Sequence, residues 1–296
     1  MTHTRRRPSP RRTAVVATAV ASAALLSLAA PSAQARPADA DAAGTPNYVA
    51  LGDSFASGAG LPEKRDKTCD RTVGSHPALL ASSLNATFKD ATCSGATTRS
   101  IWNHQGTKPP QAQALSKGTR LVTLTIGGND IGFTEVLTRC VTSSFSDPSG
   151  SPCKKYFTAG GSDQLANRIN KVESRIGSVL TDVRRRSPNA KVIVVGYPSL
   201  FPDSGVGCRE VPIAKGDFAY LRDTTKRLNA VLQRQAAGHG VTYADTYTPT
   251  IGHDMCQPQE RRWIEPLKPA GGALPAHPNA TGQLVMWLAA YGALNK

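Results

Sequence analysis

The chain has 296 residues and a formal net charge of +14, from 35 Lys and Arg against 21 Asp and Glu. The basic residues are scattered and no basic–aromatic stripe stands out, so we expect no nucleic-acid partner. No segment after the amino-terminal region is long and apolar enough to span a bilayer, which argues against an integral membrane protein.

The first 35 residues have the organisation of a secretory signal peptide. Five arginines are followed by a run of small and apolar residues, 13–30, and then by the small-x-small sequence Ala33-Gln34-Ala35. We therefore expect a secreted, extracellular protein whose signal peptide is cleaved after about Ala35. The pair Arg11-Arg12 also permits a twin-arginine export route.

Cleavage would leave 261 residues with a net charge of +9. Residues 36–46, rich in Ala, Pro and Asp, are expected to form a disordered lead-in, and residues 47–296 suit a single domain with a substantial core. The positive charge predicts transient contact with anionic lipid surfaces, or else it serves solubility alone. We expect a monomer.

The six cysteines all lie in the mature chain, and an even number in an exported protein predicts three disulfides. Sequential pairing is our hypothesis, because each pair then brackets a loop-rich stretch. The expected bridges are Cys69–Cys93, Cys140–Cys153 and Cys208–Cys256. A zinc site is disfavoured because no Cys-x-x-Cys pair occurs, and we expect no metal.

Predicted strands and helices alternate along the mature chain. Apolar and β-branched runs predict strands at residues 48–51, 87–93, 121–126, 191–198 and 241–247. Helices are expected at residues 77–85, 165–183, 217–237 and 280–294. This alternation predicts right-handed βαβ units and a three-layer α/β/α sandwich with about five parallel strands.

Four long segments between these elements are expected to be irregular loops. They are rich in charged residues or in Pro, Gly and Ser, and they span residues 59–76, 140–161, 199–216 and 248–278. Since five of the six cysteines lie in them, we expect disulfides to keep them ordered around the rim of a pocket.

Polar residues follow three of the predicted strands in turns built from small residues. These turns are Gly52-Asp53-Ser54, Ser94-Gly95 and Gly127-Gly128-Asn129-Asp130, and a fourth polar segment, His277-Pro278-Asn279, precedes the last helix. Because parallel strands bring their carboxyl ends to one edge of a sheet, the four segments can meet. Together they supply the parts of acyl transfer by a serine nucleophile.

Each part has a definite role in that chemistry. Ser54 would attack an ester carbonyl, and the His277 imidazole would take its proton and return it to the leaving alcohol. The Ser54 N–H, the Gly95 N–H and the Asn129 side-chain amide would hold the oxyanion. Glycine at 95 lets a backbone N–H approach the substrate without an intruding Cβ.

Other polar residues near these positions are interpreted structurally. Asp53 is expected to hold its turn through backbone hydrogen bonds, and Asp130 to cap the helix after the third strand and to tie its own turn. His253 is the second choice for the base.

The four segments, in this order, resemble the markers of the secreted GDSL or SGNH hydrolases, in particular the disulfide-containing bacterial lipase and esterase branch. The likeness runs from about residue 47 to residue 294. It implies a flavodoxin-like fold, ester hydrolysis without a cofactor, and three oxyanion donors. Ordinary α/β-hydrolases are disfavoured, because Ala56 stands where their Gly-x-Ser-x-Gly elbow has its second glycine.

The sequence departs from the family at one position. Many members have an Asp three residues before the histidine, where this chain has Leu274. We predict that a backbone carbonyl of residues 273–276, that of Leu274 first, accepts the His277 ring N–H. Asp254 or Glu265 is the alternative partner.

The resemblance implies a secreted lipase or esterase acting on acyl esters or lipids. Acylglycerols or simple esters are the first choice, followed by phospholipid acyl groups and then polysaccharide acetyl groups. Apolar residues expected either to line an acyl channel or to pack in the core are Phe55, Leu61, Ile131, Phe133, Phe145, Leu200 and Phe201.

Two other functions remain open. A metal-dependent phosphoesterase would use Asp53, Asp130 and His277 as ligands, although such sites need several more. A secreted binding module on a degenerate hydrolase scaffold would turn over no ester.

Overall fold

The computed structural model describes residues 47–269 and 272–296, all of which belong to one compact unit. The predicted signal peptide and lead-in, residues 1–46, lie outside the described residues. Within the part described, none of the helices combines the length and apolar character needed to cross a bilayer.

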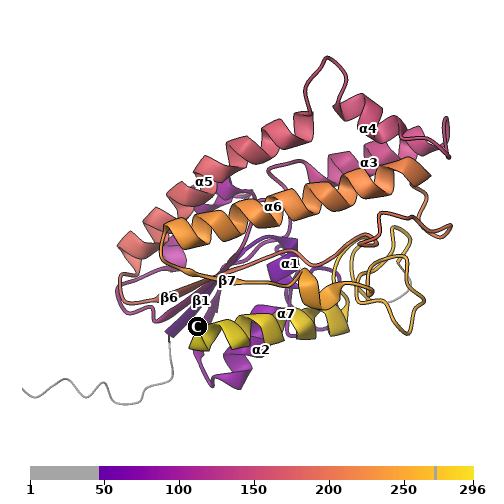
Figure 1. The fold of residues 1–296 in the computed structure, drawn as a ribbon. Coiled ribbons are helices and arrows are strands. Elements are labelled where there is room, and N and C mark those ends of the chain that lie inside the picture. Colours follow the sequence, from indigo (N-terminus) through magenta and orange to yellow (C-terminus); the bar gives the residue numbers. More distant parts are fainter. Residues whose placement is uncertain (1–46, 270–271) are drawn as a thin grey trace, which may run out of the picture. The chain divides into compact units, whose positions relative to one another are not determined.

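A five-stranded parallel sheet with strand order β4-β1-β5-β6-β7 forms the middle layer (Figure 1). The strands are β1 Asn47–Gly52, β4 Thr87–Asp90, β5 Leu121–Thr125, β6 Lys191–Val195 and β7 Thr242–Ala244. Every neighbouring pair is parallel, which confirms the predicted sheet. Every residue of β5 is buried, which explains why its sequence is a continuous run of apolar and β-branched residues.

Helices cover both faces of the sheet (Figure 1). On one face α5 (Gln164–Arg186) packs against α6 (Phe218–Gly238), and on the other α2 (His76–Ser83) packs against α7 (Ala280–Gly292). The α/β/α sandwich is therefore confirmed. The remaining α-helices among the described residues are α1 Ser54–Ser57, α3 Phe133–Ser144 and α4 Pro152–Phe157.

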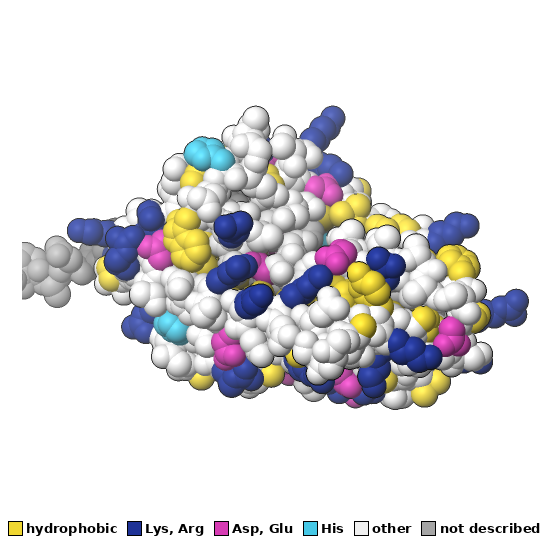
Figure 2. All heavy atoms as spheres, turned by 90° about the horizontal axis from the view of Figure 1, so that it is seen from above, with side chains coloured by type: hydrophobic (Ala, Val, Ile, Leu, Met, Phe, Trp, Pro, Cys, Tyr) yellow, Lys and Arg dark blue, Asp and Glu magenta, His cyan; other side chains and the backbone are white. Residues whose placement is uncertain are grey.

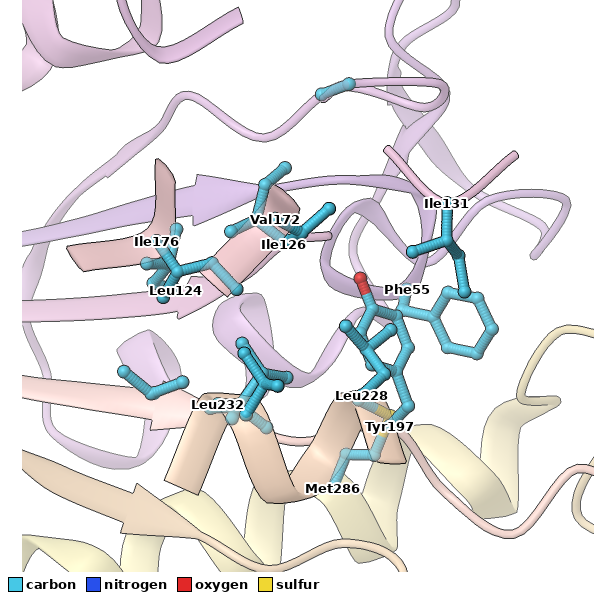
Figure 3. Close-up of a cluster of buried hydrophobic side chains, with 14 of the residues drawn as sticks. Phe55, Leu124, Ile126, Ile131, Val172, Ile176, Tyr197, Leu228, Leu232 and Met286 are labelled. Atoms are coloured by element: carbon cyan, nitrogen blue, oxygen red, sulfur yellow. The ribbon is translucent and has the colours of Figure 1, made fainter. Parts of the chain in front are cut away.

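The core forms where apolar helix stripes meet the sheet (Figure 3). Ile176 of α5 lies near Leu124 of β5, and Val172 lies near Ile126, which follows β5. Leu228 and Leu232 of α6 contribute to the same cluster. In α5 the apolar residues recur at spacings of three and four, and Asp163 caps the helix by accepting from the N–H groups of residues 165 and 166.

The α5–α6 face carries charges of both signs (Figure 2). Arginines on these helices pair with acids, as in Arg227–Asp163 at 2.9 Å and Arg234–Glu173 at 3.1 Å. Such mixed pairing distributes the positive charge over this face and interleaves it with negative charge.

The prediction of a loop over residues 140–161 is wrong. Helix α3 extends through Cys140 to Ser144, and α4 begins at Pro152. The cap of α4 comes from Asp217, which accepts from the N–H groups of Cys153 and Lys154 at 3.0 and 2.8 Å. A cap supplied from so far along the chain leaves no local signal in the sequence of α4.

Smaller corrections concern the first loop and the strand ends. Residues 59–76 contain a two-stranded antiparallel sheet, β2 (Lys64–Asp66) with β3 (Arg71–Thr72). Strands β4, β6 and β7 end earlier than expected, because their last predicted residues turn into the loops at the carboxyl edge of the sheet.

All three predicted disulfides are present: Cys69–Cys93, Cys140–Cys153 and Cys208–Cys256. The first ties the hairpin to the loop after β4, and the second ties α3 to α4. The third joins the loop after β6 to the loop before α7.

Replacing Cys208 and Cys256 together by Ala should lower the free energy of unfolding by about 2–4 kcal/mol, because the unfolded chain regains the freedom of a long loop. Urea unfolding followed by circular dichroism measures the loss. Removing Cys140–Cys153 is the matched control: its sequence separation is 13 rather than 48, so its loss should be smaller, by roughly 1 kcal/mol. A Cys208/Cys256 variant as stable as the wild type would contradict this account.

Candidate active site

Ser54 is the first residue of α1, directly beyond the carboxyl end of β1. The turn that presents it requires glycine at 52, which has φ +146°, and an added Cβ would lie 2.5 Å from the Thr125 carbonyl oxygen. Asp53 caps α1, its Oδ1 accepting from the Phe55 N–H at 3.0 Å. The Gln111 side-chain amide holds both backbone groups of Gly52, at 2.8 and 2.9 Å.

His277 lies beside Ser54. Its Nε2 is 2.7 Å from the Ser54 Oγ, and its Nδ1 is 2.8 Å from the Pro275 carbonyl oxygen. A carbonyl oxygen can only accept, so Nδ1 carries the proton and Nε2 is left to accept from the serine hydroxyl. This tautomer suits a general base acting on Ser54.

The carbonyl that accepts the ring N–H belongs to Pro275, within the predicted residues 273–276, and the first choice, Leu274, is wrong. The Leu274 carbonyl instead accepts the backbone N–H of His277 at 3.1 Å, closing a tight turn in which Ala276 has φ +59°. The turn leaves the next carbonyl, that of Pro275, for the ring.

The two acids considered as alternatives have other contacts. Asp254 accepts from the Cys256 N–H at 2.9 Å. Glu265 lies 3.6 Å from the Arg262 guanidinium, and its backbone pairs with that of residues 276 and 277 at 3.0 and 2.9 Å. Glu265 thus helps to place His277 through its main chain.

The surroundings of His277 favour a neutral ring. The Phe55 ring stacks on the imidazole with centroids 4.7 Å apart. Burial lowers the pKa of His277 below its ordinary 6.5, and the hydrogen bond to Pro275 opposes this only in part. The imidazole is therefore available as a base at neutral pH.

Gly95 and Asn129 line the same cavity as Ser54 and His277. Gly95 has φ +79°, a conformation that favours glycine. The Asn129 amide donates to the Ala96 carbonyl at 2.9 Å, and since a side-chain amide has two N–H bonds, one is left over. The structure thus brings together all four segments that the sequence selected.

Asp130 does not cap α3, contrary to the sequence-based expectation. The N-cap position is Gly132, and the Asp130 carboxylate accepts from the Thr98 N–H and hydroxyl at 2.8 and 2.5 Å. The Arg175 guanidinium lies 3.5 Å from it. Asp130 therefore ties the turn after β5 to the loop that carries Gly95.

Tyr197 is a site residue that the sequence reasoning missed. Its hydroxyl donates to the Asp53 Oδ2 at 2.5 Å and accepts from the Gly128 N–H at 2.8 Å. Burial raises the pKa of Asp53 to about 7, and the bond from Tyr197 counteracts part of that rise. Tyr197 follows β6 after one glycine, but the predicted strand ran to residue 198 and included it. With the strand ending at Val195, the criterion that selected the other turns, a polar side chain at a strand's carboxyl end, would have found it.

An apolar cavity of about 150 Å³ opens beside Ser54. Five of the seven apolar residues proposed from sequence line it: Phe55, Ile131, Phe133, Leu200 and Phe201. Leu61 is buried elsewhere, and Phe145 is 77% exposed. Helix α6 closes the cavity with residues the sequence did not single out: Leu221, Thr224, Thr225 and Leu228.

A second, more open groove of about 520 Å³ meets the cavity at four shared residues: Phe133, Thr134, Leu274 and His277. Its other walls are mainly apolar and come from Leu137 and Val141 of α3, Pro212 and Leu267. The inner cavity and the outer groove therefore adjoin at His277, the candidate base.

The remaining candidates do not join this cluster. His253, the second choice for the base, stacks on Trp263 with centroids 3.3 Å apart, and its Nδ1 bonds to the Arg261 carbonyl. Among the residues described, no three or more His, Cys, Asp or Glu side chains are grouped to hold a metal ion.

Comparison with known proteins yields consistent similarities. The model of the GDSL-like lipase/acylhydrolase family matches residues 50–285. Lipase 2 of Streptomyces coelicolor is 39% identical over 259 residues, covering 85% of this chain and 86% of that protein. The crystal structure of an extracellular lipase from Streptomyces rimosus matches with a TM-score of 0.69 and 29% identity, covering 84% of this chain and 100% of that one. A phospholipase A1 from Streptomyces albidoflavus matches with a TM-score of 0.66 and 31% identity, covering 84% and 99%.

The His277 ring should titrate below pH 6.5, because burial disfavours the imidazolium form. Proton NMR of the histidine Cε1–H resonances measures this directly, with His277→Gln identifying the signal. Since only the neutral ring accepts a proton, kcat/KM for an uncharged ester should remain high as pH falls to 6.5 and decline below it. A titration at or above 6.5 would contradict burial as the dominant influence.

Proposed function

Because the chain belongs to the GDSL-like lipase/acylhydrolase family, we propose that this carboxylic ester hydrolase works through an acyl-enzyme formed on Ser54, with His277 as the base. The observation that carries the proposal is the 2.7 Å contact between the Ser54 Oγ and the His277 Nε2. The Pro275 carbonyl, rather than an acid, orients the ring.

In the first half-reaction the Ser54 Oγ attacks the ester carbonyl carbon while its proton moves to the His277 Nε2. The tetrahedral intermediate collapses, the bond to the alcohol oxygen breaks, and His277 returns the proton to that oxygen. In the second half-reaction His277 takes a proton from a water molecule, whose oxygen attacks the acyl carbon. The bond from that carbon to the Ser54 Oγ then breaks, His277 returns the proton to Oγ, and the acid is released. The imidazolium formed in each half-reaction is stabilised by the Pro275 carbonyl accepting from Nδ1.

The oxyanion is held by the Ser54 N–H, the Gly95 N–H and the second N–H of the Asn129 amide. Fixed donors of this kind need no reorganisation as charge develops, which is why each contributes strongly to the rate. Two observations support these three donors. Ser54, Gly95 and Asn129 line one cavity, and hydrogen bonds from Asn129 to Ala96 and from Thr98 to Asp130 hold their turns in place.

Ser54→Ala should reduce kcat roughly 10⁴- to 10⁶-fold without unfolding the protein. The matched control is Ser57→Ala, a buried serine on the same helix that should keep nearly full activity. A serine-directed organophosphonate should label the wild type and Ser57→Ala at one residue, and should not label Ser54→Ala.

Full activity in Ser54→Ala would overturn the proposal. Loss of activity with a chelator, combined with indifference to the organophosphonate, would instead favour the metal-dependent phosphoesterase.

The substrate is an acyl ester whose chain enters the inner cavity. An apolar cavity of this size holds a benzene-sized group, so we propose that a short or medium acyl chain fits inside and that the rest of the substrate lies in the outer groove. Acylglycerols or simple esters remain the first choice. Phospholipids are the second candidate, supported by 31% identity to a phospholipase A1 and by Lys268 beside the groove.

Thr224→Leu should shift the preference toward shorter chains. Thr224 lines the cavity, and its hydroxyl bonds to the Tyr220 carbonyl of its own helix at 2.8 Å, so the larger side chain removes space without orphaning another side chain. Relative to butanoate, kcat/KM for a p-nitrophenyl octanoate should fall about 10-fold, whereas Thr224→Val should leave the profile unchanged. An unchanged profile in Thr224→Leu would place the acyl chain elsewhere.

We also propose secretion, with residues 1–35 as the signal peptide and cleavage after about Ala35. The extracellular lipase of Streptomyces rimosus among the similar structures supports export. The protein would act as a monomer in transient contact with anionic lipid surfaces, as its net positive charge favours.

A further inference from the structure

Tyr197 is held rigidly beside the nucleophile. It is 3% exposed, and its ring lies edge-on to Phe55 with centroids 5.0 Å apart. Asn229 of α6 fixes its backbone, accepting from the Tyr197 N–H at 2.8 Å and donating to its carbonyl at 2.7 Å. Figure 3 shows the ring close to Leu228 and Met286, with the hydroxyl at the end that points away from Met286.

The Tyr197 hydroxyl joins two turns of the site. It donates to Asp53, whose other oxygen caps the helix of Ser54, and it accepts from Gly128, the neighbour of Asn129. The β1–β5 backbone pairing ends near the Asp53 N–H, which donates to the Thr125 carbonyl at 2.9 Å. Beyond that bond, the Tyr197 phenol links the Asp53 turn to the Gly128 turn.

Gly128 fits the same arrangement. A Cβ added there would lie 3.1 Å from the Tyr197 hydroxyl oxygen and 3.3 Å from its ring carbons, tighter than ordinary contact. The absence of a side chain at 128 thus allows the phenol to approach the backbone N–H closely.

We propose that Tyr197 is a positioning residue that sets the separation between the Ser54 hydroxyl and the Asn129 amide. The inference rests on the proposed roles of those two residues. An oxyanion donor stabilises the transition state only at the correct distance from the attacked carbon, and small displacements cost much of the rate. Asp130 fixes the same turn to the Gly95 loop, so Tyr197 completes the connection among all three donors.

Tyr197→Phe should lower kcat for a soluble ester roughly 10- to 100-fold and change KM little, because the ring stays and only the two hydrogen bonds are lost. The matched control is Tyr48→Phe. Tyr48 is fully buried and bonds to the Thr123 hydroxyl at 2.6 Å within the sheet, one residue from the start of β1. Its variant should lose stability but keep kcat.

A double-mutant cycle separates positioning from general destabilisation. If Tyr197 acts by placing Asn129, then Tyr197→Phe should cost less than about threefold in kcat once Asn129→Ala is present. Circular dichroism and thermal melting establish that each variant is folded. If Tyr197→Phe does not fold, the same cycle is run with Asp53→Asn, which keeps the side-chain oxygen that caps α1.

Either of two results would overturn the inference. The first is a kcat of Tyr197→Phe within about twofold of the wild type. The second is a double variant whose loss of kcat equals the product of the losses in Tyr197→Phe and Asn129→Ala. Ser54→Ala, measured in parallel, distinguishes this failure from failure of the proposed function. An active Ser54→Ala overturns the function, whereas an inactive Ser54→Ala beside a fully active Tyr197→Phe overturns only the role of Tyr197.

Discussion

The hydrogen bond between Ser54 and His277 joins residues separated by 223 positions, and the fold on the α2–α7 side holds them together. Gln283 of α7 donates to the Phe55 carbonyl in α1 at 3.0 Å and accepts from the backbone N–H of His76 in α2 at 2.8 Å. At the start of α7, Asn279 accepts from the Gly282 N–H and donates to the Arg262 carbonyl. The helix after the base is thus bonded directly to the helix of the nucleophile.

Buried side chains around the site are used to hold backbone turns. Gln111 binds both groups of Gly52, Asn229 both groups of Tyr197, and Gln283 the carbonyl of Phe55. A buried polar group is costly unless it is bonded, and these side chains find their partners in backbone groups beside the site. The buried polar side chains therefore supply hydrogen bonds that hold the backbone of the turns around the site.

The buried carboxyl of Asp53 lowers the stability of the fold when it is ionised. Burial raises the pKa of Asp53 to about 7, above its unfolded value of 3.8, so the folded protein holds its proton more tightly between these values. Stability from this group accordingly decreases as pH rises from 3.8 toward 7. Because this carboxyl lowers stability at neutral pH, we attribute its place beside the nucleophile to function. It caps the helix of Ser54 and accepts the hydrogen bond from Tyr197.

The amino-acid sequence was sufficient to place the five strands of the main sheet and the four site segments, and it supported a hypothesis for the disulfide pairs that the structure confirms. Apolar runs ending in glycine-rich turns are local signals, and parallel strands gather their ends by a general rule, so Ser54, Gly95, Asn129 and His277 could be brought to one edge without coordinates. Only the tertiary structure decided that the Pro275 carbonyl orients the ring, because the choice between adjacent carbonyls depends on how one turn closes. The cap of α4 by Asp217, the bridge made by Tyr197 and the wall that α6 gives the cavity likewise depend on partners far along the chain, for which no local pattern exists.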